Sequence, residues 1–178
     1  SSSDIGEATI SGTISFTPAN WDTPQTVTVT GVDENTIDGD QTSTITITIV
    51  DSISDSDFSN VADQTVSVVT TDNDVAGFTI EETEGSTEVD ESGTTDTFTV
   101  VLDAQPTSDV VLTITSDDTG EATVNSPLTF TPANWDTPQT VTVTGVDEDI
   151  VDGTITSTIT SRVDDADAAD DFVAVAQR

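Results

Sequence analysis

Residues 16–34 read FTPANWDTPQTVTVTGVDE, and residues 130–148 repeat this stretch without a change. With the same offset of 114 positions, residues 1–64 align with residues 115–178 without a gap, and 37 of these 64 pairs are identical. A repeat of this length indicates successive copies of one structural unit.

The boundary between two units is expected in the polar segment 72–77, DNDVAG, which lies between two strand-like runs. Residues 1–74 are then the C-terminal part of one repeat, and residues 75–178 are the next repeat without its last strand. The chain thus holds about one and a half units. We interpret it as a window onto a longer array, and the alternative is a subunit whose missing strands come from a neighbour by strand donation.

Alternation with a period of two residues dominates each unit. Val or Ile alternates with Thr or Ser in residues 26–30, 140–144, 43–49, 64–68 and 97–102, and residues 109–114 form a more apolar run. About seven such short runs per unit, separated by Pro, Gly, Asn and Asp, predict an all-β fold of tandem antiparallel β-sandwiches. The core is expected to combine Val, Ile and Leu with five phenylalanines: Phe16, Phe58, Phe78, Phe98 and Phe130.

Charge and composition exclude several classes of function. The 178 residues include 35 Asp and Glu but only 2 Lys and Arg, which gives a net charge of -33, and there is no His or Cys. Arg162 and Arg178 cannot neutralise a nucleic-acid backbone or an anionic membrane surface. No apolar run is long enough to span a membrane, and no signal peptide is present. We therefore expect no nucleic-acid partner, no direct membrane insertion and no enzyme activity, since imidazole and thiolate chemistry is absent.

Acidic residues recur at the ends of the predicted strands. Loops of a β-sandwich gather at its poles, so carboxylates from separate loops converge, and like charges held together favour a counter-ion. Calcium binds about 6–8 oxygen ligands in flexible geometry. The alternative for any single acid is a solvated surface charge, but we interpret one set together as calcium ligands: Asp33, Glu34, Asp38, Asp72 and Asp74.

The FTPANW turn, the TVTVTGVDE segment followed by DGD at 38–40, and the closing TDND at 71–74 resemble the Calx-beta domain. The chain is most similar to the tandem Calx-beta-like repeats of very large bacterial surface proteins and adhesins, and the resemblance covers essentially its whole length. It implies an immunoglobulin-like β-sandwich that binds calcium at one pole, beside the junction with the next domain.

The resemblance also implies the metal ligands. The family's acidic pair and third acid match Asp33, Glu34 and Asp38 in the first copy and Asp147, Glu148 and Asp152 in the second. The acids that close the domain match Asp72 and Asp74, and the Glu that opens the first long strand corresponds best to Glu91. A last family acid, before the FTP turn, has no clear match, and its candidates are Asp117, Asp118 and Glu121.

The pattern departs from the family in each unit. The first unit has no counterpart of Glu91, and the second has no counterpart of the closing acids, so neither set is complete. In addition, Asp40 of the first copy is Thr154 in the second. The two sites are therefore not expected to be equal.

The predicted function is that of a calcium-binding structural repeat in the stalk of an extracellular adhesin or cell-surface filament of a bacterium. Its partners would be neighbouring repeats or identical subunits, with cell-surface or glycan contact elsewhere in the full-length protein. One alternative is a filament subunit completed by strand exchange. Another is a carbohydrate-binding module that uses Trp21 and Trp135, although these indoles are more simply read as caps on the end of the core.

Overall fold

In a computed structural model, which describes residues 1–151, 153–164, 172 and 175, the chain is all-β. It divides into two compact units. Unit 1 comprises Ser1–Glu34 and Asp38–Asn73, and unit 2 comprises Asn35–Ile37 and Asp74–Arg178. The predicted all-β, antiparallel fold class is confirmed. The immunoglobulin-like topology and the assignment of residues 1–74 and 75–178 to successive Calx-beta-like repeats stay predictions.

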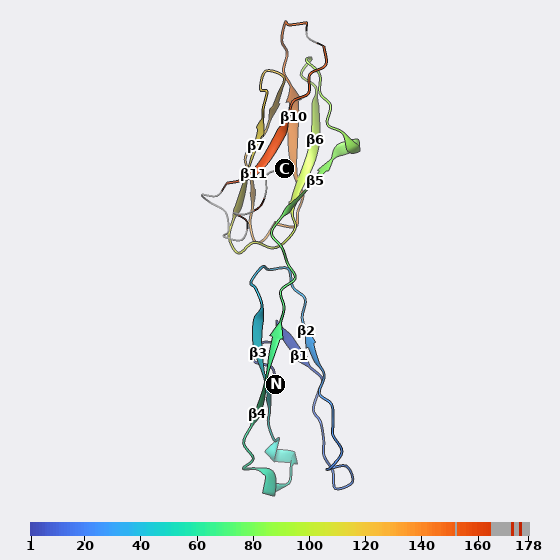
Figure 1. Ribbon diagram of the computed structural model, residues 1–178, viewed down its shortest axis with the longest axis vertical. Coiled ribbons are helices and arrows are strands. Elements are labelled where there is room, and N and C mark those ends of the chain that lie inside the picture. The colour runs from blue at the N-terminus through green and yellow to red at the C-terminus, as the bar shows by residue number, and fades with distance from the viewer. Residues whose placement is uncertain (152, 165–171, 173–174, 176–178) are drawn as a thin grey trace. The chain divides into compact units, whose positions relative to one another are not determined.

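Unit 2 contains two antiparallel sheets in its described part (Figure 1). One sheet has the order β5-β6-β10-β8, and the other has the order β11-β7-β9. Every strand pair in them is antiparallel. The strands are β5 (Phe78–Glu82), β6 (Thr95–Leu102), β7 (Val110–Ser116), β8 (Ala122–Val124), β9 (Leu128–Phe130), β10 (Gln139–Gly145) and β11 (Ile159–Val163).

A single hydrophobic core lies between these two sheets. Phe98 and Val100 of β6 are buried with Val141 of β10 from one sheet, and Leu112 of β7 and Phe130 of β9 come from the other. Along β10 the buried Val side chains alternate with threonines, as a sheet with one apolar face requires. Burying a side chain such as Val, Leu or Phe stabilises a fold by about 1.5–3 kcal/mol. Unit 2 is therefore a β-sandwich held by its own core.

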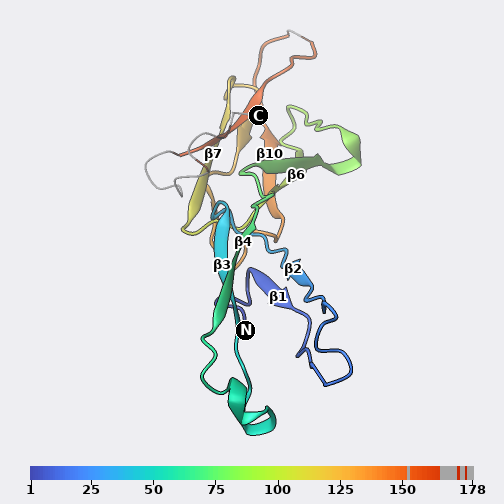
Figure 2. The ribbon, with the colours of Figure 1, turned by 60° about the horizontal axis from the view of Figure 1, so that its bottom comes forward.

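Unit 1 contains two separate two-stranded ladders. β1 (Ala8–Ile10) pairs with β2 (Val29–Gly31), and β3 (Gln41–Ile47) pairs with β4 (Gln64–Thr70), both antiparallel. Figure 2 shows the ladders spreading apart toward the loops that connect their strands. Three short 3-10 turns are η1 (Asp51–Ile53), η2 (Ser56–Phe58) and η3 (Thr83–Gly85).

The register of unit 1 reproduces that of unit 2. Ala8 faces Gly31 as Ala122 faces Gly145, which is the same pair 114 positions later. The predicted strand 26–30 is nevertheless too long, because β2 begins only at Val29. The corresponding residues 140–142 of unit 2 pair with β6. Positions equivalent to β6 precede residue 1, so residues 26–28 have no such partner in the chain.

The predicted core is partly wrong for the same reason. Phe78, Phe98 and Phe130 are buried as expected, but Phe16 and Phe58 remain 54% and 56% exposed. Their repeat counterparts, Phe130 and Phe172, are fully buried in unit 2. In unit 1 the opposing strands that would cover these rings are not among its residues.

Candidate metal centre

The two ladders of unit 1 are joined at the pole where β1 and β3 begin and β2 and β4 end. The hydroxyl of Thr70, the last residue of β4, donates a hydrogen bond to the carbonyl oxygen of Glu7 at 3.0 Å. The backbone N–H of Val32, just after β2, donates to the same carbonyl at 2.9 Å. These two bonds hold the loops at this pole next to one another.

Three carboxylates meet at this pole. Glu7 precedes β1, Glu34 follows β2 and Asp38 precedes β3, and one carboxylate oxygen from each lies within 4.8 Å of the others. Glu7 is half-buried, while Glu34 and Asp38 are exposed. We call Glu7, Glu34 and Asp38 the acidic triad.

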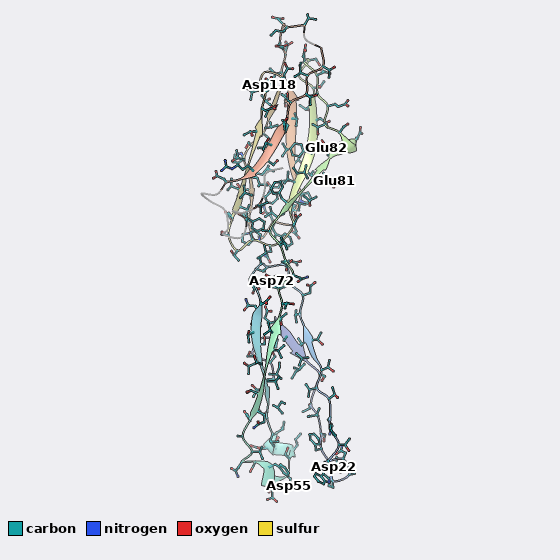
Figure 3. The ribbon with its side chains drawn as sticks, viewed as in Figure 1. Asp22, Asp55, Asp72, Glu81, Glu82 and Asp118 are labelled. Carbon is teal, nitrogen blue, oxygen red and sulfur yellow. The ribbon has the colours of Figure 1, made fainter. Side chains whose placement is uncertain are left out.

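A fourth carboxylate, Asp72, supports the loop that carries Asp38. Its Oδ2 atom accepts hydrogen bonds from the backbone N–H groups of Asp38 at 3.2 Å and Gly39 at 2.9 Å. The N–H of Asp72 in turn donates to Oδ1 of Asp40 at 3.2 Å. Gly39 has a φ of 72°, which glycine adopts without steric cost. Figure 3 labels Asp72 at this end of unit 1, with Asp22 and Asp55 at the opposite end.

The electrostatics of the acidic triad disfavour three negative charges without a cation. Partial burial, followed by the nearby charges of Asp38, Glu34, Asp4 and Asp72, raises the pKa of Glu7 above its usual value. Each of these causes opposes ionisation of the Glu7 carboxyl. A bound cation would reverse that effect, because an opposite charge stabilises the carboxylates.

The ligand atoms in this cluster suit a hard cation. All three members of the acidic triad offer carboxylate oxygens, which are the ligands that calcium and magnesium prefer, and no His or Cys occurs in the chain. Calcium accepts irregular oxygen arrangements, whereas magnesium requires near-ideal octahedral geometry. The acidic triad could therefore hold a metal ion that prefers oxygen ligands.

The structure brings together only part of the predicted first set. Glu34 and Asp38 belong to the acidic triad, and Asp72 is hydrogen-bonded to the backbone next to Asp38. Asp33 is exposed and is not a member of the triad. Asp74 belongs to unit 2 and is not a member either.

Sequence reasoning missed Glu7. This residue is the repeat counterpart of Glu121, which was one of three candidates for the unmatched acid before the FTP turn. Transferring all three candidates to the first copy gives Ser3, Asp4 and Glu7, and only Glu7 directly precedes β1. The register of the repeat could therefore have found it.

In unit 2 the described residues contain no comparable cluster. Glu121 precedes β8, and its carbonyl accepts a hydrogen bond from Val146 N–H at 2.9 Å, which repeats the bond between Val32 and Glu7. Glu148 is half-buried and Asp147 is exposed. Asp152, the counterpart of Asp38, lies outside the described residues. The predicted second set of ligands therefore lies beside the same backbone hydrogen bond as the first, but its third acid, Asp152, is outside the described residues.

The predicted ligand Glu91 lies in an exposed turn just before β6. The neighbouring Asp90 caps this turn, because its Oδ1 accepts from the N–H of Ser92 at 2.8 Å and from its hydroxyl. These hydrogen bonds, the side-chain bond first, lower the pKa of Asp90. Glu91 is not part of any carboxylate cluster among the described residues.

The two tryptophans differ in their surroundings. Trp135 of unit 2 is half-buried and packs against the hydrophobic core, and its carbonyl accepts a hydrogen bond from Leu102 N–H at 3.2 Å. Trp21 of unit 1 is 72% exposed. The contacts of Trp135 favour the interpretation of the indole as a cap on the core rather than a sugar-stacking platform.

Comparison with known proteins adds no neighbour: no family model, no curated protein and no solved structure matches this chain. Among the described residues, no helix is long and apolar enough to cross a membrane.

Proposed function

We propose that this chain is a calcium-binding structural repeat from the stalk of an extracellular bacterial adhesin or cell-surface filament. The observation that carries the proposal is the acidic triad of Glu7, Glu34 and Asp38, whose carboxylates lie within 4.8 Å of one another. The sequence resemblance to Calx-beta domains supports calcium as the ion. Neighbouring repeats or identical subunits are its proposed partners.

Calcium would act here as a cross-link between strand ends. The acidic triad joins residues next to β1, β2 and β3, and Asp72 ties β4 to the same loop through its hydrogen bonds to Asp38 and Gly39. An ion that holds these carboxylates would offset their mutual repulsion and restrain all four strands of unit 1. Because these strands form only two separate ladders, the restraint would contribute a large part of the stability of unit 1.

The proposal is tested by thermal unfolding during a calcium titration. Binding to the folded state at a calcium concentration about 100 times the Kd would stabilise unit 1 by about 2.7 kcal/mol. For a unit of this size, each kcal/mol raises Tm by roughly 4–8 °C. Fluorescence of Trp21 in a Trp135→Phe background reports on unit 1. An unchanged Tm at millimolar calcium would sink the proposal.

Matched variants separate specific binding from charge screening. Glu34→Gln and Asp38→Asn remove one carboxylate each from the acidic triad and are expected to abolish the response to calcium. Asp22→Asn and Asp55→Asn remove one charge at the opposite end of unit 1 and are expected to leave it intact (Figure 3). An equal loss of response in both pairs, or an equal response to sodium at matched ionic strength, contradicts a defined site.

A second candidate function is a filament subunit completed by strand exchange. It is favoured by the exposed apolar side chains of unit 1, whose repeat counterparts in unit 2 are buried. Phe16 and Phe58 correspond in this way to Phe130 and Phe172, and Val29 corresponds to Val143. A strand from another molecule would cover these side chains by adding to a sheet edge. Light scattering tests this candidate, because a monodisperse monomer across micromolar concentrations contradicts it.

A further inference from the structure

A short segment from the first half of the sequence forms part of unit 2. Asn35–Ile37 is assigned to unit 2, although both flanking segments belong to unit 1. The backbone N–H of Gln105 donates to the carbonyl oxygen of Asn35 at 2.7 Å. Thr36 forms a parallel bridge with Gln105, and its hydroxyl donates to Oε1 of the Gln105 amide at 3.3 Å.

Apolar packing supports these polar contacts. Ile37 is partly buried and packs against the hydrophobic core of unit 2. On the receiving side, Pro106 is fully buried, and Nε2 of Gln105 donates to the carbonyl oxygen of Pro132 at 2.8 Å. The turn between β6 and β7 that receives Asn35–Ile37 is thus anchored to the FTPANW turn of the repeat. We call residues 104–106 the receiving turn.

The repeat contains a second copy of the inserted segment. Residues 149–151, Asp-Ile-Val, are the counterparts of Asn35–Ile37 and directly follow the repeated stretch 130–148. Ile150 is 65% exposed and Val151 is fully exposed, at 102%. Two adjacent apolar side chains at this acidic loop are therefore in contact with solvent, and their burial against a partner would be favourable. The same position of the repeat is therefore partly buried in one copy and exposed in the other.

We propose that residues 149–151 form a docking segment for a further copy of this β-sandwich repeat. The segment would add to the receiving turn of that copy as Asn35–Ile37 adds to the receiving turn of unit 2. The carbonyl oxygen of Asp149 would accept from the Gln105-equivalent N–H, and Val151 would pack against the core at the position of Ile37. The hydroxyl bond of Thr36 would be replaced by apolar contact of Ile150.

The chemistry of the segment defines its partner. A second molecule of this same chain presents a receiving turn that already holds its own Asn35–Ile37. The partner is therefore a repeat whose receiving turn does not already bind a segment equivalent to Asn35–Ile37; such a receiving turn is called open. The interaction relies on main-chain hydrogen bonds and apolar packing, so it goes beyond the proposed calcium site and does not depend on it.

The test uses a chain extended in the phase of the repeat. Because Arg178 is the counterpart of Gln64, residues 1–178 are followed directly by a second copy of residues 65–178. The added copy carries an open receiving turn and is isotope-labelled separately, so that its Gln105 amide is resolved by NMR hydrogen exchange. We expect this amide to exchange as slowly as Gln105 of unit 2, at least about tenfold slower than an unbonded loop amide.

Paired variants identify the contact. Val151→Asp in the extended chain is expected to accelerate exchange of the added Gln105 amide, and Ile37→Asp is expected to do the same at Gln105 of unit 2. Val151→Asp in the 178-residue chain is the control and is expected to leave exchange and Tm unchanged. Val151→Ile, which installs the residue found at position 37, is expected to retain protection.

Two results would overturn the proposal. One is fast exchange of the added Gln105 amide in the unsubstituted extended chain. The other is slow exchange that persists with Val151→Asp, and Val151→Ser provides the same comparison if the Asp variant does not fold. The measurement is made with calcium and with a chelator. Because docking does not depend on the metal site, protection is expected in both conditions. Absence of protection in both conditions contradicts docking and leaves the proposed calcium site, which the calcium dependence of Tm tests, unaffected.

Discussion

The same stretch of sequence lies in two environments in this molecule. Residues 16–34 and 130–148 are identical, yet Phe16 and Trp21 of unit 1 are exposed, whereas Phe130 is fully buried and Trp135 packs against the core of unit 2. In unit 2 this stretch is paired within both sheets, because β10 pairs with β6, and β9, which ends at Phe130, pairs with β7. The two copies therefore distinguish structure that the repeated stretch forms by itself from burial that depends on neighbouring strands.

Local structure is the same in both copies. Asn20 and Asn134 each accept a hydrogen bond from the N–H of the Thr three residues earlier, Thr17 and Thr131. Hydrogen bonds between backbone groups in the turn are also repeated, at 3.0–3.1 Å. The FTPANW turn therefore forms without a covering core, because its hydrogen bonds are made within the turn itself.

The largest expected difference between the copies concerns the repeated phenylalanine. Phe130→Ala removes a fully buried ring from the core of unit 2 and is expected to destabilise that unit by about 3–5 kcal/mol. Phe16→Ala removes the identical, half-exposed residue and is expected to cost less than about 1 kcal/mol. Urea unfolding measures both variants. Trp135 fluorescence in a Trp21→Phe background reports the stability of unit 2 for Phe130→Ala, and Trp21 fluorescence in a Trp135→Phe background reports that of unit 1 for Phe16→Ala. Equal losses would contradict the difference in burial.

The repeated glycine should show a smaller contrast. A Cβ at Gly145 would overlap the main-chain carbonyl of Asp90, whereas a Cβ at Gly31 would only meet Cγ2 of Thr70 at 3.6 Å. Gly145→Ala is therefore expected to destabilise unit 2 by roughly 1–3 kcal/mol. Gly31→Ala is expected to be neutral or to stabilise unit 1 by about 0.4–1 kcal/mol.

Circular dichroism during thermal unfolding measures both glycine variants. The comparison is controlled by position, since the two residues share their neighbours in sequence from residue 16 to residue 34 and from 130 to 148. A destabilised Gly31→Ala variant would show that unit 1 is packed more tightly at this pole than its structure indicates.

The smallest expected difference is in the response to pH. Hydrogen bonds from the N–H groups of Glu88 and Thr97 lower the pKa of Asp96 in unit 2, and Ser92 lowers that of Asp90. A lowered pKa in the folded state stabilises the fold above the usual Asp pKa, and this contribution is lost as pH falls through the folded value. Glu7 of unit 1 has a raised pKa, so its contribution is present at low pH and is lost as pH rises through the folded value.

Unfolding of each unit between about pH 2 and pH 7, followed by its own tryptophan, checks these opposite signs. Asp96→Asn is expected to weaken the loss of unit 2 stability as pH falls. Glu7→Gln is expected to flatten the unit 1 profile in the absence of calcium. Parallel profiles for the two units, or profiles unchanged by these substitutions, would contradict the assigned causes.

Much of the fold could be predicted from alternation alone. The predicted runs 97–102 and 140–144 lie within β6 and β10, and the run 109–114 overlaps β7. Val alternating with Thr suits a sheet with one buried face. The prediction was wrong for residues 26–28 and for burial of Phe16 and Phe58. Those errors share one cause: strand extension and burial depend on a pairing partner, and the pattern of a strand does not record whether its partner is present.

The candidate site was predicted in the same partial way. Loop position and charge identified Glu34, Asp38 and Asp72, since strand ends of a sandwich meet at a pole. Asp33 is not in the acidic triad although it is adjacent to Glu34, because adjacency in sequence does not determine where a side chain lies in space. Glu7 was missed because it lies about 27 residues before Glu34 in the sequence and outside the repeated stretch 16–34.

The amino-acid sequence by itself determined the repeat, the all-β class, the strand alternation and the local FTPANW turn, because each depends on residues close together along the chain. Only the tertiary structure decided which Phe and Trp side chains are buried, which carboxylates share a pole and which unit contains Asn35–Ile37. These features depend on contacts between residues such as Glu7 and Asp38, or Asn35 and Gln105, and a linear pattern does not encode distances across space.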